Sequence, residues 1–130
     1  MSVIRIGPGA PWEGIVGYSR VVIRGDAAWV SGTTSMADGV VVHKGDAAAQ
    51  TRQALAIIRE SLERAGFTLP DVVRTRMFVT DISRWEEIGR AHGEVFGDVR
   101  PASSMLQVAA LIDPEMLVEI EADAVRGAGA

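Results

Sequence analysis

The sequence predicts a single α+β domain that spans residues 1–130. Two observations lead to this prediction. Short runs rich in Val, Ile and Thr, which are typical of strands, are interleaved with two longer segments of helical periodicity. Their order along the chain is strands, helix, strand, helix, strands, which is the pattern of an α+β fold. A chain of this length can bury a core without disulfides or a metal ion.

The N-terminal half is expected to form two hairpins. Tyr18–Arg24 is typical of a strand, and a Gly-Asp turn leads to its partner strand Ala27–Ser31. Met36–Val42 contains an Asp-Gly pair followed by three valines, which indicates a second hairpin. The segments Met1–Gly14 and Gly127–Ala130, rich in small residues, are expected to be flexible ends.

Two helices are expected. Asp46 is a candidate N-cap for a helix that continues through Ala65, with Gly66 at the position that follows the C-cap. One face of this helix carries apolar residues at helical spacing, namely Leu55, Ile58 and Leu62. The segment Ser83–Glu86 matches a capping box and predicts the start of a second helix, which ends near Gly97.

Further strands complete the predicted sheet. They are Val72–Thr80, Ser103–Ala109 and Leu117–Ala124. Two helices can cover only one face of such a sheet, yet the strands carry apolar residues at both parities, as in Val21–Ile23 and Met77–Val79. We therefore expect the second face to be buried by oligomerisation.

Composition and charge exclude several classes of site. The chain has no cysteine, so thiol nucleophiles, disulfides and thiolate metal sites are excluded. The formal net charge of −4, with dispersed Arg residues and few aromatic residues, argues against nucleic-acid binding. No apolar run approaches the length of a signal core or a membrane span, so we expect a soluble cytoplasmic protein.

Glu119 is the first candidate functional residue. It lies between Val118 and Ile120 in the last predicted strand, where an acid is costly to bury unless it has a function. Glu121 and Asp123 have the same parity, so a solvent-exposed acidic strand face is the alternative interpretation.

Other signals for chemistry are weak. His43 and His92 are too far apart in the sequence to indicate a metal pair, and a surface or packing role is the simpler interpretation of each. Gly32–Ser35 follows a predicted strand and could hold an anion with backbone N–H groups, although it also fits an ordinary turn. The sequence contains no P-loop, dinucleotide fingerprint or nucleophile elbow, and it predicts no metal site and no organic cofactor.

Six short motifs, in order over nearly the whole chain, resemble the Rid family of reactive-intermediate deaminases, also called the YjgF family. They are GYSR (Gly17–Arg20), VSGT (Val30–Thr33), AQTRQAL (Ala49–Leu55), DVVRTRMFVTD (Asp71–Asp81), RPASS (Arg100–Ser104) and VEIEADAV (Val118–Val125). The resemblance implies a chorismate mutase-like mixed sheet with two helices on one face. It also implies a homotrimer in which the other faces form a central β-barrel, with small-molecule clefts between subunits.

The resemblance further implies a site at those clefts. Glu119 matches the acid that positions a water in deaminase members, and Tyr18 matches a tyrosine of the same pocket. Ser31 and Gly32 match a Ser-Gly pair whose backbone, together with that of Thr33, is expected to bind polar groups of the ligand.

One expected residue is missing. In deaminase members an arginine that follows the Pro-Ala pair binds the substrate carboxylate, and here Ser103 stands in its place. Met105 replaces a common cysteine, and Arg100 precedes the proline. A serine hydroxyl cannot form the two parallel charged hydrogen bonds of a guanidinium. Arg100, Ser103, Ser104 and Met105 are therefore the candidates for the altered part of the pocket.

Two hypotheses remain open from the sequence. The first is an enzyme that hydrolyses a small enamine, imine or related unsaturated acid, with Glu119 holding the water and Tyr18 orienting the ligand. The second is a non-catalytic trimer that binds a small ligand or a partner protein at the same clefts. The historical label of endoribonuclease is a third interpretation, which the acidic balance of the chain disfavours.

Overall fold

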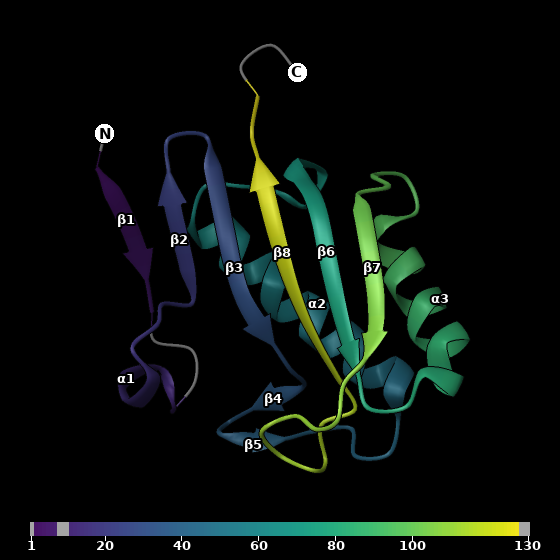
Figure 1. Cartoon of the computed structure of the whole chain (residues 1–130). Helices are drawn as coiled ribbons and strands as arrows, with labels where there is room; N and C mark the ends of the chain where they lie inside the picture. Colours follow the sequence, from purple (N-terminus) through teal and green to yellow (C-terminus); the bar gives the residue numbers. More distant parts are fainter. Residues whose placement is uncertain (1, 8–10, 128–130) are drawn as a thin grey trace.

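A computed structural model describes residues 2–7 and 11–127 and shows a six-stranded sheet with two long helices (Figure 1). Among the strands of the described residues, β6 and β7 pair in parallel and the other neighbours in this sheet are antiparallel. From one edge to the other the strands are β1 (Val3–Ile6), β2 (Val21–Arg24), β3 (Ala27–Thr33), β8 (Val118–Val125), β6 (Val72–Val79) and β7 (Ala102–Gln107). The predicted α+β class is confirmed.

Both long helices lie behind the same face of this sheet (Figure 1). They are α2 (Ala47–Arg64) and α3 (Trp85–Phe96). The smaller elements are α1 (Glu13–Val16), a separate hairpin of β4 (Met36–Ala37) and β5 (Val40–Val41), and the 3₁₀ turns η1 (Leu69–Asp71) and η2 (Ile82–Arg84). Within the described residues, no helix has both the length and the apolar character that a membrane span requires.

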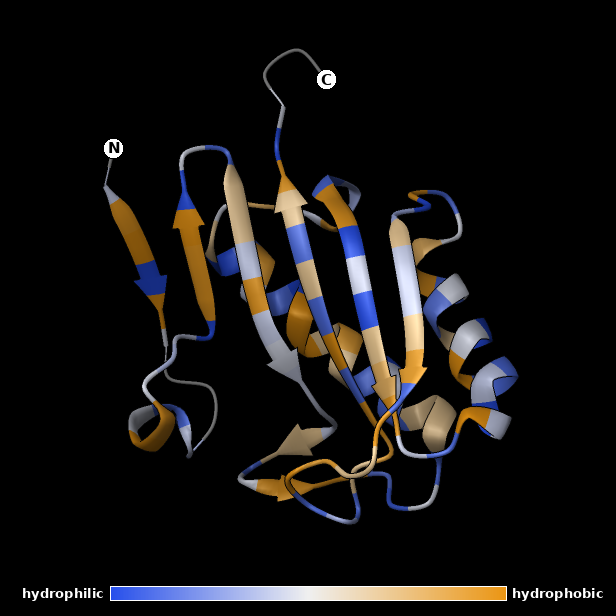
Figure 2. Ribbon diagram, viewed as in Figure 1, coloured by the Kyte–Doolittle hydropathy of each residue, from blue (hydrophilic) through white to orange (hydrophobic). Residues whose placement is uncertain are grey.

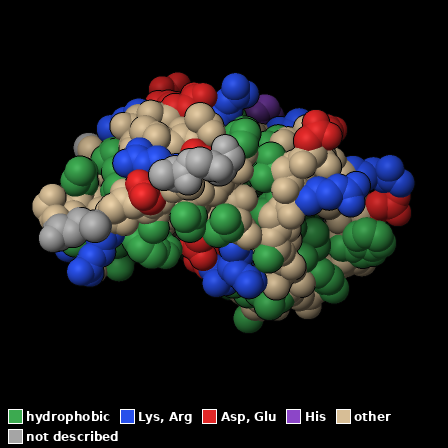
Figure 3. Space-filling view, turned by 90° about the horizontal axis from the view of Figure 1, so that it is seen from above, with side chains coloured by type: hydrophobic (Ala, Val, Ile, Leu, Met, Phe, Trp, Pro, Cys, Tyr) green, Lys and Arg blue, Asp and Glu red, His purple; other side chains and the backbone are tan. Residues whose placement is uncertain are grey.

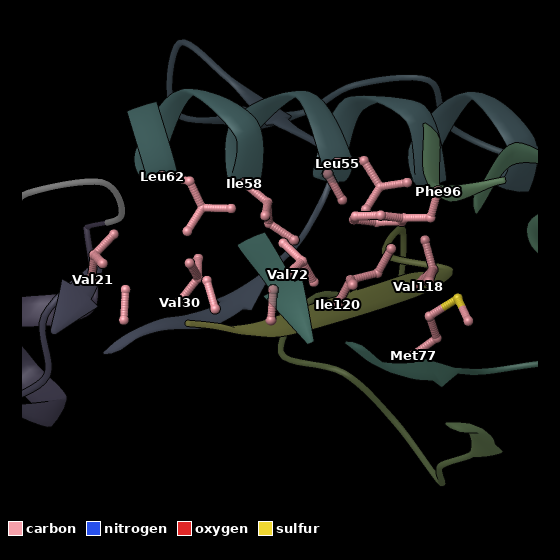
Figure 4. Packing of buried hydrophobic residues seen from close by; sticks show 14 of the residues in the cluster. Val21, Val30, Leu55, Ile58, Leu62, Val72, Met77, Phe96, Val118 and Ile120 are labelled. Carbon is pink, nitrogen blue, oxygen red and sulfur yellow. The ribbon is translucent and has the colours of Figure 1, made fainter. Parts of the chain in front are cut away.

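The core lies between α2 and the sheet. The α2 side chains Leu55, Ile58 and Leu62 point toward the strands in Figure 4, and each is at most 1% exposed. Val30 and Ile120 meet them from the sheet. Burying an aliphatic side chain of this size contributes about 1.5–3 kcal/mol, so this layer holds the sheet rigid beneath its open face.

The predicted ends of α2 are confirmed. The Asp46 carboxylate accepts a hydrogen bond from the backbone N–H of Ala49 at 3.0 Å, which satisfies a free donor of the first turn. Gly66 follows the C-cap with φ of +85°, a backbone conformation that side chains disfavour and that glycine adopts freely.

The capping box expected at Ser83–Glu86 is wrong. The Ser83 hydroxyl and N–H both bond the Asp81 carboxylate, which caps the 3₁₀ turn η2 instead. The Glu86 carboxylate pairs with Arg90 one turn later at 2.6 Å. The end of α3 at Phe96, with Gly97 as its C-cap, agrees with the prediction.

The prediction of a flexible segment before residue 15 is also wrong for the residues that the structure describes. Val3–Ile6 forms the edge strand β1, which pairs antiparallel with β2, and Glu13–Val16 forms α1. A segment of four residues is too short to show the alternating pattern of a strand. This strand is stabilised by its backbone pairing with β2, which the local sequence does not reveal. Residues 1, 8–10 and 128–130 of the two predicted ends lie outside the described residues.

The sheet face opposite the helices is open in the single chain. Polar and apolar residues alternate along β8 in Figure 2, and Glu119, Glu121 and Asp123 all lie on this open face. Arg76 of β6 bonds Glu121 and Asp123 at 3.2 and 3.3 Å. Trp29 on the same face stays 46% exposed, so residues 2–7 and 11–127 supply no covering layer over it.

Candidate functional site

Glu119 and Gly32 meet where β8 pairs with β3. The pairing contains a bulge, because two residues of β3, Ser31 and Gly32, lie opposite the single residue Glu121 of β8. Such bulges bend a strand and redirect its neighbours. Here the bulge brings the Glu119 carboxylate against the Gly32 backbone. A Cβ at Gly32 would lie 2.7 Å from Glu119 Oε2 and 2.9 Å from its Cδ.

Gly32→Ala tests this contact. The added methyl group must displace the Glu119 carboxylate, whose end is flexible. We expect a small loss of stability, about 1 kcal/mol, and a larger loss of ligand turnover or binding, about tenfold to a hundredfold. Thermal melting and the ligand assay measure the two effects. Gly93→Ala is the matched control, because a Cβ at Gly93 has no neighbour within 4 Å. Equal ligand binding and turnover in both variants would contradict the assigned contact.

Glu119 forms part of the wall of a depression of about 420 Å³ at one end of the open face. The depression is lined by Trp12, Val16, Tyr18, Ser31, Gly32, Ile112, Glu119 and Glu121. It therefore brings together four residues that the sequence analysis selected, from the α1 segment, β3 and β8. Its volume suits a small molecule.

The pKa values of two side chains that line this depression depart from their ordinary values. Burial raises the pKa of the Glu119 carboxyl above its ordinary value, the neighbouring carboxylate of Glu121 raises it further, and the Arg20 guanidinium partly opposes them. Burial also raises the pKa of the Tyr18 hydroxyl, against an opposing effect of Arg20. Tyr18 is therefore a neutral hydrogen-bond donor near pH 7, beside a carboxyl group that binds a proton more readily than an exposed one.

The Ser31 N–H and hydroxyl and the Thr33 hydroxyl all donate to acceptors within the chain. The Ser31 hydroxyl donates to the Ser19 carbonyl at 2.6 Å, and its N–H donates to the Arg20 carbonyl at 3.0 Å. Thr33 is 1% exposed, and its hydroxyl donates to the Ser31 carbonyl at 2.8 Å. Both residues thus fix the shape of the bulge, and Ser31 also lines the depression together with Gly32 and Glu119.

Arg20 is a buried cation whose role the sequence analysis missed. Its Nη2 donates to the carbonyl oxygens of Ser31 and Gly32 and to the Thr33 hydroxyl. The residue is only 6% exposed. Arg20 belongs to the GYSR motif and directly precedes the apolar strand β2. An arginine in such a position is a signal for a structural or electrostatic role.

The residues after the Pro-Ala pair lie elsewhere. Ser103, Ser104 and Met105 belong to β7, which is separated from β8 by β6 and therefore lies about 10 Å from it. Ser104 is exposed, and Met105 packs against the core on the helix side. Arg100 is exposed with φ of +53°, and its Nε donates to the Gly97 carbonyl at 3.1 Å.

Ser103 is held by a chain of hydrogen bonds toward α3. Its hydroxyl lies 2.8 Å from the hydroxyl of the buried Thr75, which lies 2.9 Å from His92 Nε2. Burial lowers the pKa of the His92 ring, which favours its neutral form. The ring also packs against Phe96. His92 is therefore a packing residue in this chain, as the simpler interpretation predicted.

The predicted site residues thus fall into two groups within one chain. Tyr18, Ser31, Gly32 and Glu119 come together at the depression, and Thr33 lies directly behind them. The β7 residues and Arg100 do not join them. Among the described residues, no group of three or more His, Cys, Asp or Glu side chains is arranged to hold a metal ion.

Comparisons with known proteins agree on the family. The family model for endoribonuclease L-PSP matches residues 10–126. An uncharacterized Streptomyces coelicolor protein is 36% identical over 127 residues, covering 98% of this chain and 95% of its own. The 3-aminoacrylate deaminase RutC of Acinetobacter baylyi is 42% identical over 80 residues, covering 62% of this chain and 63% of its own.

A solved structure gives the same result. The Mycobacterium tuberculosis protein Rv2704, a member of the highly conserved YjgF/YER057c/UK114 family, superposes with a TM-score of 0.87. It is 51% identical, and the match covers 96% of this chain and 100% of that chain. With the family model matching most of the chain and the fold agreeing, the chain belongs to the endoribonuclease L-PSP family, which is the YjgF or Rid family.

Proposed function

We propose that the depression at Glu119 is an active site for the hydrolysis of a small enamine or imine. The observation that carries this proposal is the placement of the Glu119 carboxylate, half-buried against Gly32 in a depression that also contains the Tyr18 side chain. The similarity to a 3-aminoacrylate deaminase supports the same class of reaction.

The reaction follows from these groups. An enamine first takes a proton from solvent on carbon and becomes an iminium ion, and an imine reaches the same state by protonation on nitrogen. Water then adds to the C=N carbon while the Glu119 carboxylate accepts its proton, which gives a neutral carbinolamine. The Glu119 carboxyl returns that proton to nitrogen, and the C–N bond breaks as the hydroxyl proton leaves to solvent, so the products are a carbonyl compound and ammonia. Tyr18 donates a hydrogen bond that orients the ligand.

We propose that the complete site lies between subunits. One chain presents the Glu119 group on an open sheet face and the β7 group at a free strand edge, with β6 between them. A second copy could bring its own β7 against the first copy's depression, which would join the two groups. A homotrimer with a central barrel of sheets also covers the apolar side chains of the open face, such as Trp29 and Val125.

The assembly is expected to be a stable trimer at micromolar concentration. Sedimentation equilibrium should therefore give three times the chain mass of 13.8 kDa. The physical reason is that a monomer would leave the apolar side chains of the open sheet face in water, whereas a trimer buries them. A single species of 13.8 kDa at that concentration would contradict the expected assembly.

A non-catalytic ligand-binding trimer is the second candidate. The observation in its favour is Ser103, whose hydroxyl is bound to Thr75 where deaminase members carry the carboxylate-binding arginine. The endoribonuclease of the family's description has less support, because the chain carries a net charge of −4. Positive and negative side chains are also interspersed on the face seen in Figure 3.

Ammonia release separates the two candidates. Freshly generated 3-aminoacrylate and 2-iminopropionate are mixed with the protein, and ammonia is measured against the spontaneous rate. An enzyme accelerates release from at least one of these compounds or from an enamine without a 2-carboxylate. A binding protein accelerates none, but the product carboxylic acids still raise its melting temperature.

A further inference from the structure

Arg20 donates hydrogen bonds to three acceptors around the bulge in β3. Its Nη2 reaches the carbonyl oxygens of Ser31 and Gly32, at 3.0 Å for Gly32, and the Thr33 hydroxyl at 2.7 Å. These acceptors are the backbone of the bulge and the side chain just after it. Arg20 therefore fixes the position of Gly32, and Gly32 is the surface against which Glu119 rests.

A small cavity joins Arg20 to Glu119 from behind. Its volume is about 40 Å³, and it is lined by Trp12, Arg20, Gly32, Thr33, Thr34, Met36, Ile57 and Glu119. Trp12, Gly32 and Glu119 also line the depression, so they separate the two spaces. A volume of this size accommodates one water molecule, and its walls contain hydroxyl, carboxylate and guanidinium groups that can bond it.

The Nε of Arg20 gives the second, independent observation. This atom is buried and has no hydrogen-bond partner in the described part of the chain. The whole residue is 94% buried, so bulk water does not satisfy it either. A buried donor of a charged group is costly to leave unpaired. A water molecule in the cavity would satisfy it and would face the Glu119 carboxylate.

We propose that Arg20 is the positioning residue of this site: it fixes the bulge under Glu119 and, through a water molecule in the small cavity, anchors the Glu119 carboxylate. The inference rests on the proposed role of Glu119 and assigns Arg20 no contact with substrate. A guanidinium suits this position because one planar group supplies donors in several directions, whereas a lysine supplies a single point charge.

The surrounding charges agree with this role. The groups that act on the Glu119 carboxyl are Glu121 on its own strand and Arg20, and Glu119 in turn raises the pKa of Tyr18. Glu13 of α1 acts on Arg20 and Tyr18. Burial lowers the pKa of Arg20, and Glu13 and Glu119 both raise it. Arg20 is thus the cation that opposes the rise in the Glu119 pKa.

Direct titration tests the proposal without a substrate. The δ-carbons of glutamate are labelled with ¹³C, the Glu119 signal is assigned by its loss in Glu119→Gln, and its pKa is measured by NMR. We expect Arg20→Gln to raise the Glu119 pKa above the wild-type value. Arg20→Lys keeps the charge but not the set of donors, so the Glu119 pKa should lie between the values of wild type and Arg20→Gln. Arg24→Gln is the control, because it removes the same charge from an exposed position on β2.

The proposal is overturned by a Glu119 pKa that is the same in wild type and Arg20→Gln, or the same in wild type and Arg20→Lys, or by one that moves equally in Arg24→Gln. The water is tested in the wild-type protein by a rotating-frame cross-peak between water and the Arg20 Nε–H, and absence of that peak from a resolved signal also overturns it. This measurement and the Arg20→Lys titration keep the test decisive if Arg20→Gln fails to fold.

Failure here is distinguishable from failure of the proposed function. If Glu119→Gln abolishes ammonia release while Arg20→Gln leaves the Glu119 pKa unchanged, the site stands and the Arg20 assignment falls. If Glu119→Gln leaves ammonia release unchanged, the proposed reaction falls, whatever the titration shows.

Discussion

Glu119→Gln is expected to reduce the accelerated release of ammonia by about 10²–10⁴-fold, the usual contribution of a positioned general base. The amide has nearly the same shape but cannot accept the proton of the attacking water. The fold should be retained, because burial and Glu121 already disfavour the ionised carboxyl in the native state. Steady-state assays and thermal melting measure the two expectations.

Asp123→Asn is the matched control for this substitution. Asp123 lies on the same face of β8 and also carries a carboxylate, but it pairs with Arg76 at 3.3 Å and does not line the depression. Glu121 is a poorer control, because it lines the depression and acts on the Glu119 carboxyl. Equal rates for wild type and Glu119→Gln, or equal losses in both variants, would contradict the role assigned to Glu119.

The wild-type protein is expected to hydrolyse simple 2-imino acids slowly or not at all. Ser103 cannot bind the substrate carboxylate as a guanidinium does, and the loss of such a contact removes about 2–4 kcal/mol, or roughly two to three orders of magnitude in rate. Thr75 also holds the Ser103 hydroxyl on the helix side of β7. Ammonia release from freshly generated 2-iminopropionate measures this activity.

Ser103→Arg should raise the 2-imino acid activity if the pocket admits the longer side chain. Met105 packs against the core beside it, so Ser103→Arg with Met105→Cys is the fairer test. Arg100→Ala is the control, since Arg100 is exposed and its Nε bonds the Gly97 carbonyl. Robust hydrolysis by wild type that survives Arg100→Ala would show that the guanidinium is dispensable. Loss of that hydrolysis in Arg100→Ala would assign the role to Arg100.

Alternating polarity made the strand around Glu119 predictable, including the face on which its acids lie. The helix ends at Asp46 and Gly66 were predictable for a similar reason, because caps use few residue types at fixed positions. Ser83–Glu86 fitted the same kind of rule and was wrong. Asp81, two residues before Ser83, competed for the same donors and formed a different turn.

The interior of the site was less predictable. Gly32 contacts Glu119 because of the bulge in β3. The contact was not predictable, because no local sequence pattern indicates the extra residue in that strand. Arg20 was visible in the sequence as a charge, but its contacts join residues 11 to 13 positions away. The separation of Ser103 from Glu119 follows from strand order in the sheet, which the sequence motifs do not contain.

The pH dependence of turnover tests most directly the claim that the Glu119 carboxylate is the base. The ionised form is active, so kcat/KM should rise with pH and level off above the pKa of Glu119 in the free protein. Since burial and Glu121 raise that pKa above its ordinary value, the rise should lie above the range of an exposed glutamate and coincide with the pKa measured by NMR. A rise that matches an exposed glutamate, or one that persists unchanged in Glu119→Gln, would contradict the assignment of Glu119 as the base.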